Sequence, residues 1–112
     1  MALQMSVTLP SGIIVAGAYH RVGVTLDDRL ARKLTVCMTT HIDREACHAD
    51  LADIGAGGEP SREVRGRVNV VLDGAAYDRI EAGEIGPGGQ NLIAAIYREV
   101  AATDAYADAE AC

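Results

Sequence analysis

The sequence predicts an α+β domain: an antiparallel β-sheet of four to six strands, sandwich-like or strongly twisted, with a C-terminal α-helix packed on it. Two stretches carry this prediction. Residues 64–72 alternate between apolar and polar side chains, as an extended strand with one covered face does. Residues 91–103 repeat their apolar side chains at helical spacing, which makes one stripe along about three turns. Each element has one face to cover, and the simplest arrangement is that they cover each other.

The composition bounds the size of the core and the class of partner. At 112 residues the chain is expected to be one domain, residues 1–103, followed by an acidic, Ala-rich tail, residues 104–112. There is no Trp, no Phe and only four Tyr, so a pocket that stacks bases or sugars on aromatic rings is not expected. The formal charge of −6 repels phosphate backbones. We therefore expect no nucleic-acid partner.

Membrane and export signals are also not expected. No apolar run approaches the roughly 20 residues that a membrane-spanning helix needs, which predicts no membrane contact. The first residues lack the basic region of a secretory signal. We expect the chain to be made in the cytoplasm.

The N-terminal part is predicted to form strands. Residues 4–9 alternate, residues 10–12 interrupt the run as a tight turn, and residues 13–15 resume it, which indicates a β-hairpin. Residues 19–26 alternate again, before an expected turn at Asp27. This strand is predicted to place one set of side chains on a common face: His20, Val22, Val24 and Leu26.

The next strand is predicted at residues 32–40, where β-branched residues favour a strand over a helix. Leu34, Val36 and Met38 are expected to point inward. The outward positions are Lys33, Thr35, Cys37 and Thr39.

The remaining segments connect these elements. Residues 42–54 are polar with scattered Ala and fit a short surface helix or an ordered loop, and residues 55–60 are a flexible connection. Tyr77 and Ile80 share one face of a short helix. A second loop, residues 86–89, precedes the main helix, for which Asn91 is the expected N-cap.

Three His and three Cys suggest two hypotheses, a zinc site and a Cys nucleophile, and the sequence contains no specific motif for either. Zinc prefers thiolate and imidazole ligands, but the spacing of the candidate ligands matches no paired-ligand pattern. A Cys nucleophile would need a base and an orienting carboxylate, which Cys47 could find in His41 or His20 with Asp43 or Asp50. The candidate zinc ligands are Cys37, His41, Cys47 and His48. We therefore predict no metal, no cofactor and no catalytic residue.

The two ends of the chain resemble a known class of protein. Residues 1–12, Met-Ala-Leu-Gln-Met-Ser-Val-Thr-Leu-Pro-Ser-Gly, and residues 18–22, Ala-Tyr-His-Arg-Val, are similar to the opening of small structural proteins of tailed bacteriophages. Such proteins also close on a helix with an Ala-Tyr-like pair and a short acidic tail, as residues 95–97 and 104–112 do here. The loops at 55–60 and 86–89 have no counterpart in that pattern.

The resemblance implies a non-enzymatic component of a virion, placed in the tail, baseplate, neck or capsid surface. Its partners would be other virion proteins and copies of itself. Exposed sheet edges and chain ends that order on assembly suit that role. The expected subunit contacts are the loop 55–60 and five residues of strand and tail: Arg65, Arg67, Tyr106, Asp108 and Glu110.

The odd number of cysteines argues against a fully paired internal set. Because Cys112 ends the predicted mobile tail and Cys37 is predicted to face outward, we expect one of them to form an inter-subunit disulfide outside the reducing cytoplasm. Two alternatives stay open: a small adaptor or regulatory protein that binds a protein partner, and a small Cys- or metal-dependent hydrolase.

Overall fold

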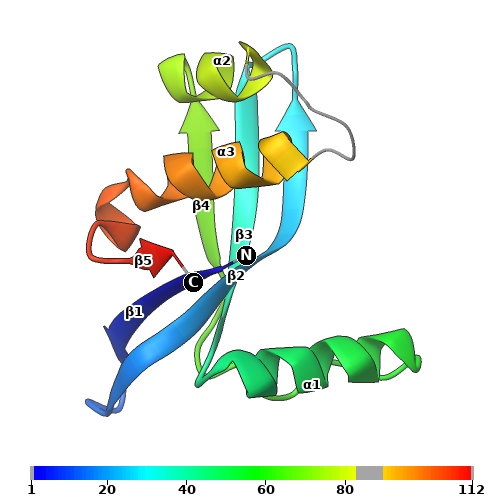
Figure 1. Cartoon of the computed structure of the whole chain (residues 1–112), viewed down its shortest axis with the longest axis vertical. Coiled ribbons are helices and arrows are strands. Elements are labelled where there is room, and N and C mark those ends of the chain that lie inside the picture. The colour runs from blue at the N-terminus through cyan, green and yellow to red at the C-terminus, as the bar shows by residue number, and fades with distance from the viewer. Residues whose placement is uncertain (1, 83–89, 112) are drawn as a thin grey trace.

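The computed structural model describes residues 2–82 and 90–111 of the chain. These residues form a five-stranded antiparallel sheet with α-helices on it and beside it (Figure 1). The sheet does not close into a barrel. The predicted α+β class, with a helix that follows the sheet and packs on it, is confirmed. In chain order the elements are β1 (Leu3–Thr8), β2 (Ile14–Asp28), β3 (Lys33–His41), α1 (Arg44–Gly55), β4 (Val68–Asp73), α2 (Ala75–Ala82), α3 (Gln90–Ala101), the 3-10 helix η2 (Asp104–Tyr106) and β5 (Glu110–Ala111).

The long strand β2 connects the two parts of the sheet. The strand order is β4-β3-β2-β1-β5, and β2 pairs with β1 through its first part and with β3 through its second. The predicted hairpin is present: Gly12, with φ of +87°, donates its N–H to the Leu9 carbonyl at 2.8 Å. The two strands predicted at residues 13–15 and 19–26 are one strand, because a register shift opposite β1 absorbs the interruption.

A second register shift, at Gly23, reverses the faces of β2. Val22 lies opposite Met38 of β3, whereas Val24 lies opposite Cys37, the residue next to Met38 in that strand. Met38 is fully buried beneath the helices, so Val22 faces the helices and Val24 faces away. A slip of one residue moves every later side chain of a strand to the other face.

The prediction of one shared face for this strand is therefore wrong. His20 and Val22 lie on the helix side of the sheet, while Val24 and Leu26 lie on the other side and are 57% and 69% exposed. Periodicity alone could not locate the shift. The only signal in the sequence was a glycine inside the alternating run.

The main core lies between the sheet and the helices α2 and α3. Leu34, Val36 and Met38 point into it as predicted, and β4 adds Val70 and Leu72. The predicted strand at 64–72 begins later, at residue 68, and lies at an edge of the sheet. The helices contribute a set of buried side chains, which includes the predicted pair on α2: Tyr77, Ile80, Ala95, Ile96, Tyr97 and Val100.

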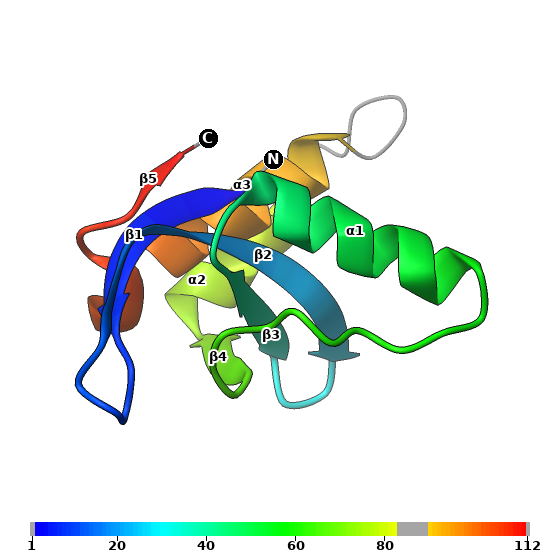
Figure 2. The same ribbon diagram turned by 90° about the horizontal axis from the view of Figure 1, so that it is seen from below.

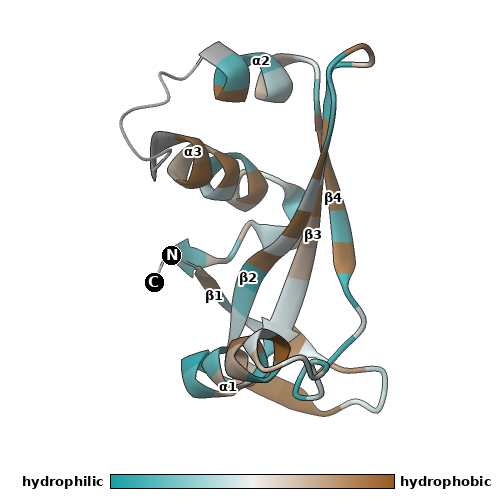
Figure 3. Ribbon diagram, turned by 90° about the vertical axis from the view of Figure 1, so that its right-hand side faces the viewer, coloured by the Kyte–Doolittle hydropathy of each residue, from teal (hydrophilic) through white to brown (hydrophobic). Residues whose placement is uncertain are grey.

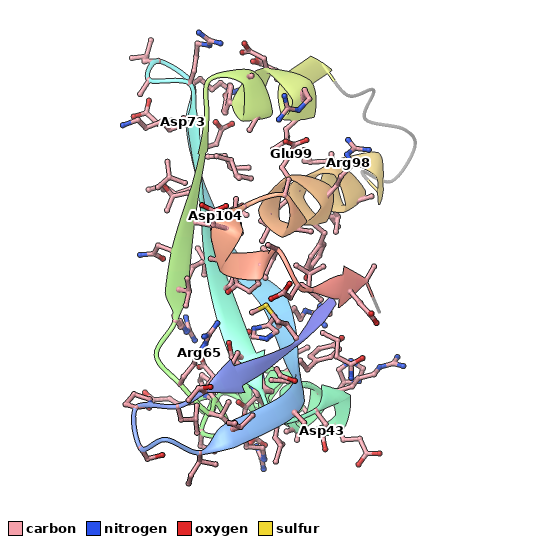
Figure 4. The ribbon with its side chains drawn as sticks, turned by 90° about the vertical axis from the view of Figure 1, so that its left-hand side faces the viewer. Asp43, Arg65, Asp73, Arg98, Glu99 and Asp104 are labelled. Atoms are coloured by element: carbon pink, nitrogen blue, oxygen red, sulfur yellow. The ribbon has the colours of Figure 1, made fainter. Side chains whose placement is uncertain are left out.

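Helix α3 begins at Gln90, so Asn91 lies inside the helix and is not its N-cap. The loop predicted at residues 86–89 lies outside the described residues. Most of the apolar stripe on α3 is covered: Ile96, Tyr97 and Val100 are buried and Leu92 and Ala101 are half-buried, whereas Ile93 is 52% exposed. Glu99 was not predicted to be buried: it lies between α3 and α2 (Figure 4), where Arg79 donates to both carboxylate oxygens.

The two sides of the sheet are covered unequally. Figure 3 shows α2 and α3 on one side, while α1 lies near the lower end of the strands. On the side away from α2 and α3, Leu26, Thr35 and Val71 form a row across three strands. Val71 is 50% exposed. We call this side, bearing exposed Val24, Leu26 and Val71, the open face.

The C-terminal segment packs against the chain itself. The sequence predicted an acidic tail that frays unless a neighbour orders it, and here the neighbour is β1, which pairs with β5. Tyr106 of η2 is fully buried in the main core. Its ring stands edge-on to His20, with ring centroids 5.4 Å apart.

Candidate functional site

A groove lies between α1 and the lower end of the open face, and it is the candidate site. Figure 2 shows α1 on one flank of the sheet, opposite the β1–β2 hairpin. Asp43 starts this helix by accepting the Ala46 N–H at 2.8 Å, as an N-cap carboxylate does. Residues 42–54 were predicted to form a short helix or a loop, and the helix is present.

One buried carboxylate fixes α1 to the sheet. Asp50 of α1 is 2% exposed and accepts hydrogen bonds from His41 Nε2 at 2.7 Å and from the backbone N–H groups of Ser61 and Arg62, each at 3.1 Å. The Arg62 guanidinium adds a fourth donor at 3.0 Å. One side chain thus joins the end of β3, the helix and the segment that returns from it.

These donors keep Asp50 ionised. Burial by itself would raise the pKa of the carboxyl, but the hydrogen bonds from His41, Ser61 and Arg62 outweigh it and hold that pKa well below its usual range. Because an ionised carboxylate only accepts, His41 must carry its proton on Nε2.

The groove has an apolar wall and a polar wall around a cavity of about 280 Å³. We call it the α1 groove. Its apolar lining residues are Val22, Val24, Leu51, Ile54 and Pro60, and its polar ones are Arg21, Thr39, His41, Cys47, Asp50, Glu63 and Arg67.

The formal charges of the α1 groove balance, but not every charged side chain in it has a partner. Arg67 donates from Nε and Nη2 to Glu63 at 3.1 and 3.2 Å. Asp50 shares the Arg62 guanidinium with Asp53. Arg21 forms no ion pair with any carboxylate of residues 2–82 and 90–111, so it is the charged groove residue that is left without one.

The structure brings together only part of the hypothetical Cys–His–Asp set. His41 and Asp50 are bonded, as one version of that hypothesis required, but His20 lies on the other side of the sheet and Asp43 caps α1. Burial raises the pKa of the Cys47 thiol, and Arg21 nearby opposes that rise only in part. Within the described ranges, no group hydrogen-bonds His41 Nδ1. The Cys47 thiol is therefore not hydrogen-bonded to His41 Nδ1, and the two do not form a thiol–imidazole pair.

The four candidate zinc ligands do not form a ligand set. Cys37 is half-buried and lies on the open face, Cys47 is buried, and His48 is exposed on α1. In the part of the chain that the structure describes, no three His, Cys, Asp or Glu side chains are placed to hold a metal ion.

The predicted subunit contacts fall into three groups. Tyr106 is fully buried, so its side chain contacts the core of its own chain and does not lie on the surface. Arg65 donates from Nε to Thr40 Oγ1 at 3.1 Å, and Arg67 is held by Glu63. Asp108 and Glu110 are exposed, and so is the loop 55–59. Of the disulfide candidates, Cys37 faces the open face and Cys112 lies outside the described residues.

A second polar cluster surrounds His20 on the helix side of the sheet. The Met5 carbonyl accepts from His20 Nε2 at 3.0 Å, so the neutral ring accepts at Nδ1 from the Thr40 hydroxyl at 3.1 Å. Arg65 donates in turn to that hydroxyl. His20 was predicted at the rim of the core and is in fact fully buried. Every polar atom of its ring is satisfied, so this cluster is structural.

Two features of the site were missed by sequence reasoning. The open face arises from the register shift at Gly23, and Asp50 looked like one of many acidic residues on a surface helix.

No helix within the described residues is long and apolar enough to span a membrane. Comparison with protein-family models, with curated proteins and with solved structures found no match to this chain.

Proposed function

We propose that this chain is a non-enzymatic structural component of a bacteriophage virion that docks other polypeptides on its open face. The tail, baseplate, neck and capsid surface are the positions that the resemblance of its ends implies. Its partners are other virion proteins and copies of itself.

The observation that carries the proposal is the group of exposed aliphatic side chains on the open face. Leu26 and Val71 are 69% and 50% exposed and flank Thr35 in adjacent strands, and Val24 lies one row further along. Single exposed apolar residues are ordinary, but several aliphatic side chains on one uncovered side of a sheet favour a protein contact there. The Cys47 thiol is buried and is not hydrogen-bonded to His41 Nδ1, so the α1 groove gives no support to hydrolysis.

The proposal is tested by counting the chain in purified particles. Particles of a phage that carries this gene are purified, and the number of copies per particle is measured by quantitative mass spectrometry. A fixed stoichiometry is expected. A chain that is expressed in infected cells but absent from particles contradicts the proposal and favours the adaptor alternative.

Paired substitutions then locate the contact. Leu26→Ser and Val71→Ser remove apolar area from the open face and are expected to reduce incorporation at least about tenfold, because interfaces depend on a few apolar contacts. Ile93→Ser, on the opposite side of the sheet, removes a comparable exposed side chain and should leave incorporation unchanged. Equal incorporation of all three variants would place the contact elsewhere.

A further inference from the structure

Arg21 is an exception among the charged residues of the α1 groove. Five other arginines of the described chain pair with carboxylates on their own chain, and they are Arg29, Arg32, Arg62, Arg67 and Arg79. Arg21 is half-buried on β2, lines the groove and has no such partner among residues 2–82 and 90–111. A partly desolvated cation gains most from an anion that is supplied by a partner.

Aliphatic side chains line the same groove as Arg21. Leu51 and Ile54 of α1 are 42% and 48% exposed, and Val24 of β2 lines the groove with them. Leu51 and Ile54 are three residues apart, so they lie on one side of the helix. An occupant therefore meets apolar side chains and the unpaired guanidinium of Arg21 within the same cavity, beside the ion pair of Arg67 and Glu63.

His41 adds a second, independent sign of an occupant. It is 3% exposed, lines the groove, and its Nδ1 has no hydrogen-bond partner among the described residues. In the neutral ring with its proton on Nε2, Nδ1 is a buried acceptor that lacks a donor among the described residues. Buried polar atoms are nearly always satisfied in native proteins, and a backbone N–H inserted from the groove would satisfy this one.

We propose that the α1 groove binds a segment of a partner protein in which one acidic residue is flanked by aliphatic residues. The carboxylate pairs with Arg21, the aliphatic side chains lie on Val24, Leu51 and Ile54, and a backbone N–H reaches His41. This inference rests on the proposed docking function and names the chemistry of one partner.

The probe is the blocked peptide acetyl-Leu-Asp-Leu-amide, titrated into the full isotope-labelled chain and followed by NMR. Shifts are expected at Val24, Leu51 and Ile54, with affinity in the weak range of short peptides. The matched peptide with Asn in place of Asp is expected to bind up to about fivefold more weakly, which is the effect of one partly exposed ion pair.

Two substitutions test whether the Asp carboxylate of the peptide pairs with Arg21. Arg21→Gln should reduce binding of the Asp peptide to the level of the Asn peptide and leave the Asn peptide unaffected, as a double-mutant cycle requires. Arg44→Gln, at an exposed arginine on α1 that does not line the groove, is the control and should change neither affinity.

Several outcomes overturn the inference. Equal binding of the two peptides, an Arg21→Gln variant that behaves as the parent, or no shift at the groove residues would each exclude the acidic partner. Shifts at the groove on concentrating the chain alone would assign the groove to a second copy instead. Particle counting is independent of these results. If the chain is found in particles but its groove binds neither peptide, the proposed function stands and only the acidic partner is excluded.

Discussion

Asp50 Oδ2 lies 2.7 Å from His41 Nε2, and both side chains are almost entirely buried. This contact joins α1 to the end of β3, and α1 forms one wall of the groove. The position of that wall therefore depends on a polar cluster, since Asp50 and Cys47 are the only buried residues of α1. Five predictions follow from the polar and apolar contacts that position these elements.

Asp50→Asn is expected to destabilise the fold clearly. The amide keeps the shape of the side chain but loses the charge that four donors surround, and it presents its own N–H₂ to one of them. Urea unfolding should give a lower midpoint. Asp78→Asn, which alters the exposed pair with Arg32, is the control and should shift the midpoint much less.

The same carboxylate makes stability depend on pH. Because the folded pKa of Asp50 lies below its unfolded value of about 3.9, its contribution is complete above that value and is lost as the pH falls below it. The parent chain should therefore lose stability in acid more steeply than Asp50→Asn. Parallel curves for the two proteins would contradict this assignment.

His20 is expected to titrate below its usual value. Burial lowers its pKa, the bond to the Met5 carbonyl opposes this, and Arg65 lowers it further. The folded state then binds fewer protons than the unfolded state, so stability is complete above the unfolded pKa of about 6.5 and falls as the pH drops through it. NMR titration of the His20 ring measures the pKa directly. A measured pKa above about 6.5 would contradict the assignment.

Tyr77 should ionise only in strong base. Its hydroxyl donates to Asp27 Oδ1 at 2.8 Å, and this bond, with burial, raises the pKa of Tyr77 to about 12. The stabilisation is present below the unfolded pKa of about 10 and is lost as the pH rises through the folded value. Asp27→Asn should lower the pKa of Tyr77, as measured by NMR of the ring carbon that bears the oxygen, and leave that of Tyr97 unchanged.

Met38→Ala should destabilise the fold by about 3 kcal/mol, because it leaves a cavity between the sheet and α3 where Met38 is fully buried. Met38→Leu conserves volume and should cost less than about 1.5 kcal/mol. Leu30→Ala, at a fully exposed turn position, should change the free energy of unfolding by no more than about 0.5 kcal/mol. Urea unfolding of the three variants provides the comparison.

Much of the fold was predictable because it depends on local pattern. The alternation of Leu34, Val36 and Met38 and the stripe on α3 both report which side of an element is buried, and the hairpin turn at residues 10–12 follows from its glycine and proline. Asn91 was misassigned as an N-cap because helix ends depend on contacts that periodicity does not record.

The candidate site was harder to predict because it depends on contacts between distant segments. The pairing of His41 with Asp50 was only one of several hypothetical combinations, and nothing in the sequence separated it from pairings with His20 or Asp43. Likewise, the buried Tyr106 packs against His20 of β2, a contact between segments that lie far apart in the sequence.

The sequence by itself determined the class of the fold, the inward residues of β3 and β4 and the aliphatic nature of the core, since these follow from periodicity and composition. Only the tertiary structure decided which face of β2 each valine occupies, because the register shift at Gly23 is defined against β3 and not within β2. The same holds for the open face and for the unpaired charge of Arg21. A surface is left uncovered, and a charge unpaired, only with respect to neighbours that folding places beside it.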